Sequence, residues 1–307
     1  MKLIVQPGAG LAPIISGIKS AKKSIDVLIF RLDRLEIVKA LEAAVGRGVA
    51  VRALTAHTNK GGEKSLRKLE MRLLEAGITV SRTADDLVRY HGKMMIVDAH
   101  TLHVYGFNFT RLDIDKSRSF GIITRNKRLV QEAIKLFQAD FDRQPYTAGC
   151  ERFIVSPVNS RERLARFVKG ARKQLLIYDP KVSDDVMLRL LVERAKAGVD
   201  VRIIGKLGGR KSELTAEKFP GKRLHVRAII RDGRRAFVGS QSLRKLELEK
   251  RREVGIVIND LGVIRQMQTV FEQDWAETDT GKKKAAKKDD KKDERKDDKV
   301  TALAAAS

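Results

Sequence analysis

The chain has 307 residues and a formal net charge of +24, with 63 Lys and Arg against 39 Asp and Glu. So one-sided a charge favours anionic partners such as nucleic acid, phospholipid head groups or phosphorylated substrates. The one cysteine, Cys150, excludes an intramolecular disulfide framework, and no apolar stretch approaches the roughly 18 residues of a membrane span. We therefore expect a cytoplasmic protein without a transmembrane segment.

The first predicted elements alternate between strands and helices. Residues 24–30, SIDVLIF, are apolar and β-branched, as in a buried strand. Residues 35–48 have apolar side chains at helical spacing and end in glycine, a helix-terminating signal, and residues 49–55 resemble a second strand. Near the other end, residues 228–239 read as a hairpin around an Asp-Gly turn. This alternation predicts an α/β fold.

The chain contains an internal repeat of two copies. An offset of 150 aligns LIVQP (3–7) with FIVSP (153–157), and GVAVRAL (48–54) with GVDVRII (198–204). Further along the offset falls to 134, so the first copy has 16 extra residues between about 55 and 90. We expect a solvated loop there, and the alternative is a segment that lines the substrate groove. Each unit reads as strand, helix, strand, helix, hairpin, helix. The predicted domains are two repeats, 1–147 and 150–276.

The tail, residues 277–307, differs in composition from the repeats. It is rich in Lys and Asp, with the stretch GKKKAAKKDDKKDERKDDK, and it has no apolar face. We expect it to be disordered.

Two copies of one polar pattern stand at equivalent places in the repeats. The first has histidine, a cation two residues later and a carboxylate five residues after that, and six residues then precede YGFNFT (105–110); its members are His91, Lys93 and Asp98. The second has the same spacing before GSQS (239–242), with His225, Arg227 and Asp232. The matched spacing of the two copies indicates a function that one copy alone would not.

This double pattern resembles the HxKxxxxD motif of the phospholipase D superfamily, which is followed after six residues by Gly-Ser and a nearby Asn. The resemblance covers residues 1 to about 276. It implies two fused α/β repeats, each a mixed sheet flanked by helices, related by a pseudo-twofold axis around one shared active site. It also implies phosphodiester cleavage through a phosphohistidine, with no metal or cofactor. By the same resemblance we expect Asp98 and Asp232 to belong to the catalytic group with the other motif residues.

The residue types suit that chemistry. One neutral imidazole can attack phosphorus while a second, protonated imidazole donates to the leaving oxygen. We assign His91 as nucleophile and His225 as general acid, following the family's usual assignment and the more complete first motif, although the order could be reversed. Lys93 and Arg227 lie two residues from each histidine, so they share a strand face with it and can hold the phosphate oxygens.

Several positions depart from the family pattern. Arg227 replaces the expected Lys, and Tyr105-Gly106 stands where the family has Gly-Ser. The remaining polar side chains near the motifs are expected to bind the phosphate: Asn108, Thr110, Ser240 and Ser242. Glu253 fits the position of a family glutamate that hydrogen-bonds the histidine, so we expect it to orient His225, whereas Ser119 stands there in the first copy.

Other polar clusters are weaker candidates. GGEKS (61–65) lacks the order and spacing of a phosphate-binding loop, and we expect a mobile surface loop. His100 and His103 should point to opposite faces of a strand, which disfavours joint metal binding.

The sequence leaves the substrate open between a phospholipid head group and DNA or RNA, and peripheral membrane contact remains open too. The non-enzymatic alternative is a nucleic-acid- or anion-binding protein with weakened motifs. The oligomeric state is unknown.

Overall fold

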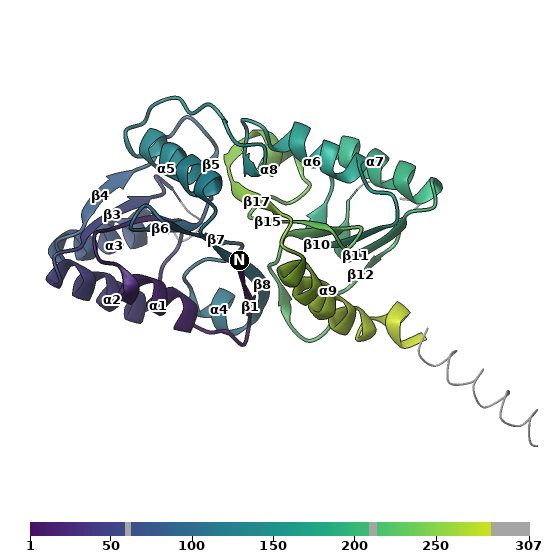
Figure 1. Ribbon diagram of the computed structural model, residues 1–307, viewed down its shortest axis with the longest axis horizontal. Coiled ribbons are helices and arrows are strands. Elements are labelled where there is room, and N and C mark those ends of the chain that lie inside the picture. Colours follow the sequence, from purple (N-terminus) through teal and green to yellow (C-terminus); the bar gives the residue numbers. More distant parts are fainter. Residues whose placement is uncertain (59–62, 209–213, 284–307) are drawn as a thin grey trace, which may run out of the picture.

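The computed structural model describes residues 1–58, 63–208 and 214–283. Two α/β repeats lie side by side, the first purple to teal and the second teal to yellow (Figure 1). Each repeat has its own mixed sheet with helices packed against it. The α/β class and the two-repeat fold expected from the sequence are confirmed.

The first repeat contains a sheet in the strand order β1-β8-β7-β6-β2-β3-β4. Its elements are β1 (Lys2–Gln6), α1 (Ala12–Ser20), β2 (Ser24–Ile29), α2 (Leu35–Gly46), β3 (Ala50–Thr55), α3 (Glu63–Glu75), β4 (Thr79–Arg82), β5 (Arg89–Tyr90), β6 (Met94–Val97), β7 (Thr101–Tyr105), α4 (Arg111–Asp115), β8 (Ser117–Thr124) and α5 (Lys127–Phe141).

The second repeat contains a sheet in the order β12-β11-β10-β14-β15-β17-β9. Its elements are β9 (Phe153–Val155), α6 (Ser160–Lys169), β10 (Gln174–Val182), α7 (Asp185–Lys196), β11 (Asp200–Leu207), β12 (Ala216–Glu217), β13 (Arg223–Leu224), β14 (Ala228–Arg231), β15 (Arg235–Gly239), α8 (Lys245–Glu249), β16 (Arg251–Arg252), β17 (Val254–Ile258) and α9 (Leu261–Ala276).

The central strands are buried on both faces, which explains their nearly continuous apolar sequences. In β2, Val27 and Ile29 pack into an outer cluster with α1 and α2, while Leu28 points the other way. In β15, Phe237 likewise faces an outer cluster with α6 and α7, and Val238 faces inward. This alternation follows the two-residue period of a strand.

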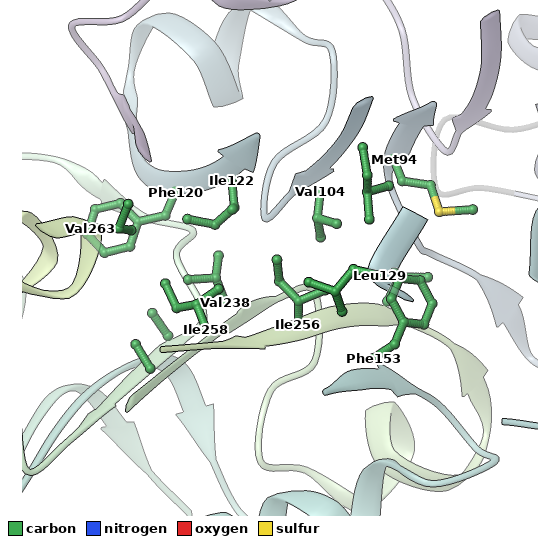
Figure 2. Packing of buried hydrophobic residues seen from close by; sticks show 14 of the residues in the cluster. Met94, Val104, Phe120, Ile122, Leu129, Phe153, Val238, Ile256, Ile258 and Val263 are labelled. Atoms are coloured by element: carbon green, nitrogen blue, oxygen red, sulfur yellow. The ribbon is translucent and has the colours of Figure 1, made fainter. Parts of the chain in front are cut away.

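The inward faces of the two sheets meet in one shared core (Figure 2). Val104 and Ile122 of the first repeat belong to the same buried cluster as Val238 and Ile256 of the second. Helices α5 and α9 also contribute side chains to this cluster. Because this apolar surface is buried only when the repeats are together, it holds the two motif-bearing halves in a fixed relation.

Polar contacts cross between the repeats in symmetric pairs. The Arg118 side chain binds Asp274 at 2.8 Å, and the Arg252 side chain binds Asp140 at 3.1 Å. Each partner of the first pair is 134 positions from a partner of the second, so these are the same contact made twice. Strand β13 pairs with β8 and β16 pairs with β5, again in equivalent places. The pseudo-twofold relation is therefore visible in individual contacts.

The predicted hairpins are present and have matching turns. In the second repeat Asp232 and Gly233 have φ angles of 54° and 63°, and in the first Asp98 and Ala99 have 54° and 51°. Two consecutive positive φ values are what a tight two-residue hairpin turn requires.

Two expectations about the connections are corrected. The extra residues of the first repeat include a 13-residue helix, α3, instead of a solvated loop. Its apolar side chains Leu66 and Leu73 are buried, which stabilises the helix. Between β11 and β14 of the second repeat, the described residues form the short strands β12 and β13 where a helix was expected.

The predicted start of the disordered tail, residue 277, is too early in the sequence. Thr278 is buried and its hydroxyl donates to the carbonyl of Trp275, while the Thr280 hydroxyl donates to Glu217. These bonds hold residues 277–283 against the second repeat. The rest of the predicted tail, 284–307, lies outside the described residues. None of the helices in the described ranges is long and apolar enough for a membrane crossing.

Candidate active site

The two motif histidines are anchored where the repeats meet. His91 follows β5 and its backbone N–H donates to the Arg252 carbonyl at 2.7 Å. His225 follows β13 and its backbone N–H donates to the Arg118 carbonyl at 3.0 Å. Each histidine is therefore positioned by a backbone group of the other repeat.

His91 has a defined partner on each ring nitrogen. Its Nδ1 lies 2.8 Å from a carboxylate oxygen of Glu253, and its Nε2 lies 2.9 Å from Nζ of Lys93. A carboxylate only accepts and an ammonium only donates, so this arrangement places the proton on Nδ1 and the lone pair on Nε2. The Phe30 ring packs edge-on against the imidazole, with 4.5 Å between the ring centroids. Nε2 is thus prepared as a nucleophile.

The contact of Glu253 corrects the sequence interpretation. Glu253 belongs to the second repeat and was expected to orient His225, but it binds His91 of the first repeat. The carboxylate reaches across the interface because the two repeats pack face to face around the motifs.

His225 also faces a carboxylate from the other repeat, Asp113 of α4. Its Nδ1 lies 3.6 Å from Oδ2 of Asp113, beyond hydrogen-bond length. The same Oδ2 accepts the backbone N–H of Asn108 at 2.8 Å, and Arg223 binds the second oxygen. Sequence reasoning missed Asp113. The available signal was the repeat itself, since the 134-residue offset places Glu247, another carboxylate, at the equivalent position.

The two cations occupy equivalent places. Lys93 is fully buried, and its Nζ donates to the His91 carbonyl at 2.6 Å. Arg227 makes the corresponding bond to the His225 carbonyl at 2.9 Å, and its Nε donates to Ser242 at 3.2 Å. Arg227 therefore fills the position of the motif lysine and keeps its charge at the site.

Burial and neighbouring cations lower the pKa of both histidines well below the ordinary range. For His91 burial is followed by the charges of Lys93 and Arg227, and for His225 by those of Arg227 and Arg223. Burial also lowers the pKa of Lys93, although the Glu253 carboxylate opposes it. Because Lys93 acts on both imidazoles and Arg227 acts on both, the two motifs form one electrostatic unit.

Comparison with protein families gives an extensive match. A family model described as "Cardiolipin synthase, PLD-like domain" matches residues 14–141 and 164–275. The chain belongs to the phospholipase D superfamily. Both repeats fall within the matched residues, so both motif copies belong to the family's fold.

One curated relative is similar over part of its sequence. The chain is 31% identical over 128 residues to the mitochondrial cardiolipin hydrolase of Danio rerio, which covers 39% of this chain and 53% of the relative. The match thus spans about half the relative's length.

Solved structures share the fold at low sequence identity. A polyphosphate kinase from Porphyromonas gingivalis superposes with a TM-score of 0.73 at 19% identity, covering 88% of this chain and 49% of that one. A phosphatidylserine synthase from Haemophilus influenzae Rd KW20 gives 0.63 at 12% identity, covering 84% and 82%. The second covers most of both chains, so the two-repeat arrangement is shared.

The polar side chains that were expected to bind phosphate fall into two groups. Asn108 binds Asp113, which faces His225, and Ser242 binds Arg227, so both are linked to the site. Ser240 is buried and exchanges hydrogen bonds with the backbone of Val254. The Thr110 hydroxyl caps α4 by accepting the Asp113 N–H at 3.3 Å, which gives it a structural contact.

Asp98 and Asp232 lie away from the histidines, in the turns at the far ends of β6 and β14. The Asp98 carboxylate accepts backbone N–H groups of residues 22–24, and Asp232 does the same for residues 172–174. They tie the hairpin turn to the start of the neighbouring strand. We therefore leave both aspartates out of the catalytic group proposed below.

The weaker candidates show no site. His103 is buried, and its Nδ1 lies 3.0 Å from the Tyr105 hydroxyl, while His100 is exposed. Of GGEKS, residues 61 and 62 lie outside the described residues and Ser65 is in α3. Within the described parts of the chain, no three His, Cys, Asp or Glu side chains are grouped so that they could hold a metal ion.

Proposed function

We propose that the protein is a phosphoric diester hydrolase in which His91 and His225 act in one composite site. The observation that carries the proposal is the pair of buried histidines, each anchored by the other repeat and each facing a carboxylate from it. Two independent sites would not need such an exchange of partners.

In the first step, Nε2 of His91 attacks phosphorus. A P–N bond forms, the P–O bond to the leaving alcohol breaks, and the leaving oxygen takes a proton from His225. Glu253 accepts from Nδ1 at 2.8 Å and stabilises the positive charge that the ring gains. In the second step water attacks, the P–N bond breaks, and His225 takes the water proton.

Lys93 and Arg227 bind the nonbridging oxygens in this proposal. In the structure Lys93 donates to Nε2 of His91, and a phosphate oxygen replaces that contact when substrate binds. Both cations then stabilise the charge that develops on the phosphoryl group. Asp113 orients His225 in this proposal.

The substrate is a phosphodiester of either a phospholipid or a nucleic acid. The name of the Danio rerio relative, a cardiolipin hydrolase, supports the lipid, and the +24 charge supports any polyanion.

The test is incubation of the wild type and His91→Ala with labelled phospholipid vesicles and with labelled DNA and RNA, all in EDTA. We expect cleavage of one class by the wild type and none by the variant. Tight binding of a labelled polyanion without turnover by the wild type would favour the anion-binding alternative.

A further inference from the structure

Oδ1 of Asn108 is a buried acceptor beside the active site. Its Nδ2 donates to Oδ2 of Asp113 at 2.6 Å, and a carboxylate can only accept, so the amide orientation is fixed. Its Oδ1 is then left without a hydrogen-bond partner among the described residues, although the side chain is only 6% exposed. A buried acceptor without a donor costs free energy unless a ligand supplies the donor.

The unpartnered Oδ1 atom indicates what kind of group can bind it. Nonbridging phosphate oxygens are acceptors, so the phosphate contact expected for Asn108 would use the second N–H of Nδ2 and not Oδ1. A hydroxyl group can bind Oδ1, because it carries a donor hydrogen.

Asn108 lines a pocket of about 350 Å³ beside the histidines. The lining also includes Arg31, next to Phe30, which packs on His91, and Arg223, two residues before His225. Leu66 and Leu69 of α3 form an apolar wall. The lining contains two arginines and two aspartates, Arg31, Arg223, Asp33 and Asp113. Their formal charges cancel, so the pocket suits a neutral polar group better than an ion.

The second repeat has no equivalent acceptor. Ser242 stands at the position that corresponds to Asn108, and its hydroxyl accepts from Arg227. Helix α3 also has no counterpart among the described residues of the second repeat. The pocket therefore makes the composite site asymmetric.

We propose that this pocket is a specificity subsite for a hydroxyl-bearing alcohol group of the substrate, which donates to Oδ1 of Asn108 while the adjacent phosphate lies between the histidines. This inference rests on the proposed phosphodiesterase function and names its substrate class: phosphodiesters with a free hydroxyl near the ester oxygen. The leucines of α3 contact the carbon skeleton of the same group.

The test compares two symmetric diesters with the same charge and skeleton, bis(2,3-dihydroxypropyl) phosphate and dipropyl phosphate, followed by ³¹P NMR. Because each diester has identical ends, either end can enter the pocket. We expect the wild type to prefer the hydroxylated diester by about tenfold or more in kcat/KM, since dipropyl phosphate leaves the buried acceptor without a donor.

Three variants test which residues cause the preference. Asn108→Leu should reduce the ratio to about one, even if it lowers both rates through its contact with Asp113. Ser242→Ala, the equivalent change in the second repeat, should keep the wild-type ratio. Leu69→Trp, which leaves Asn108 intact, should raise KM for the hydroxylated diester by narrowing the pocket.

The outcomes separate this inference from the proposed function. Equal cleavage of both diesters by the wild type, or an unchanged ratio in Asn108→Leu, would overturn the subsite and leave the phosphodiesterase. Cleavage of neither diester, nor of phospholipid or nucleic acid, would overturn the function as well.

Discussion

Each half of the site combines a histidine, a cation and a carboxylate, but the distances between them differ. On the first side, His91 has its carboxylate at 2.8 Å and a lysine at 2.9 Å, so both ring nitrogens are fixed. On the second side, His225 has its carboxylate at 3.6 Å, and Asp113 is shared with other donors. A nucleophile needs a lone pair fixed in direction. A group that first gives and then takes a proton needs a ring nitrogen that is held less strongly by its partner. The difference supports His91 as the nucleophile.

The largest expected effect comes from removing either histidine. His91→Ala and His225→Ala should each lower kcat by about 10³-fold or more, because each does one half of a single reaction. For the same reason, the double variant should be no worse than the poorer single variant by more than about tenfold. His100→Ala, an exposed histidine, is the control. If each single variant kept about half of the wild-type rate, the two motifs would be independent sites.

Replacing each carboxylate by an amide tests the difference between the two sides directly. Glu253→Gln should cost about 10²-fold in kcat and Asp113→Asn about tenfold, since the first carboxylate binds its histidine directly and the second stands further away. Steady-state kinetics on one phosphodiester measures both. Asp115→Asn, on the same helix as Asp113 but paired with Arg34, is the matched control and should keep the wild-type rate.

A rescue variant makes the Asp113 assignment sharper. Adding Ser119→Glu to Asp113→Asn places a glutamate at the position equivalent to Glu253. Residue 119 lies beside Gly106, the first-repeat equivalent of Ser240. Rate and pH profile should both recover. A recovery of stability without recovery of the rate would mean that Asp113 only supports the fold.

The pH profile follows from the lowered histidine pKa values. With both pKa values below the usual 6.5, both imidazoles are neutral at pH 7 in the free enzyme, so the nucleophile is ready but the general acid lacks its proton. As pH falls from 8 towards 6, the protonated fraction of His225 rises, and kcat/KM should rise by up to about tenfold per unit. At lower pH, kcat/KM falls again, because His91 takes a proton and loses its lone pair. A plateau from pH 7 to 9 would contradict this assignment.

The turn aspartates should affect stability and not chemistry. Burial acts to raise the pKa of Asp98, but the backbone N–H groups of residues 22–24 outweigh it and lower that pKa. Its stabilisation is therefore present above the unfolded pKa and lost as pH falls through the folded one. Asp98→Asn and Asp232→Asn should each cost about 1–3 kcal/mol in denaturant unfolding at pH 7, with kcat unchanged in the folded protein. A loss of kcat would place them back in the catalytic group.

The sequence predicted the parts of the site better than their partners. The repeat offsets identified both histidines, both cations and the hairpins, because these are local patterns with matched spacing. The partner of Glu253 could not be read in this way, since it depends on how the two sheets pack face to face. Asp98 was assigned to catalysis from the motif alone, although the same pattern also describes a turn residue that holds backbone amides.

Helix α3 and Asp113 illustrate two further limits. The extra residues of the first repeat form a helix only because Leu66 and Leu73 find buried positions, which is a tertiary effect. Asp113 stands outside the motif, and its importance depends on facing His225 across the interface.

The most direct test of the central claim is to trap the covalent intermediate. The wild type is mixed with a ³²P-labelled diester, quenched in alkali within milliseconds and digested for peptide mapping. The account predicts an acid-labile, alkali-stable phosphoramidate on His91 in the wild type and none in His91→Ala. Label on His225 in the wild type, or a rapid burst of product without any labelled histidine, would contradict it.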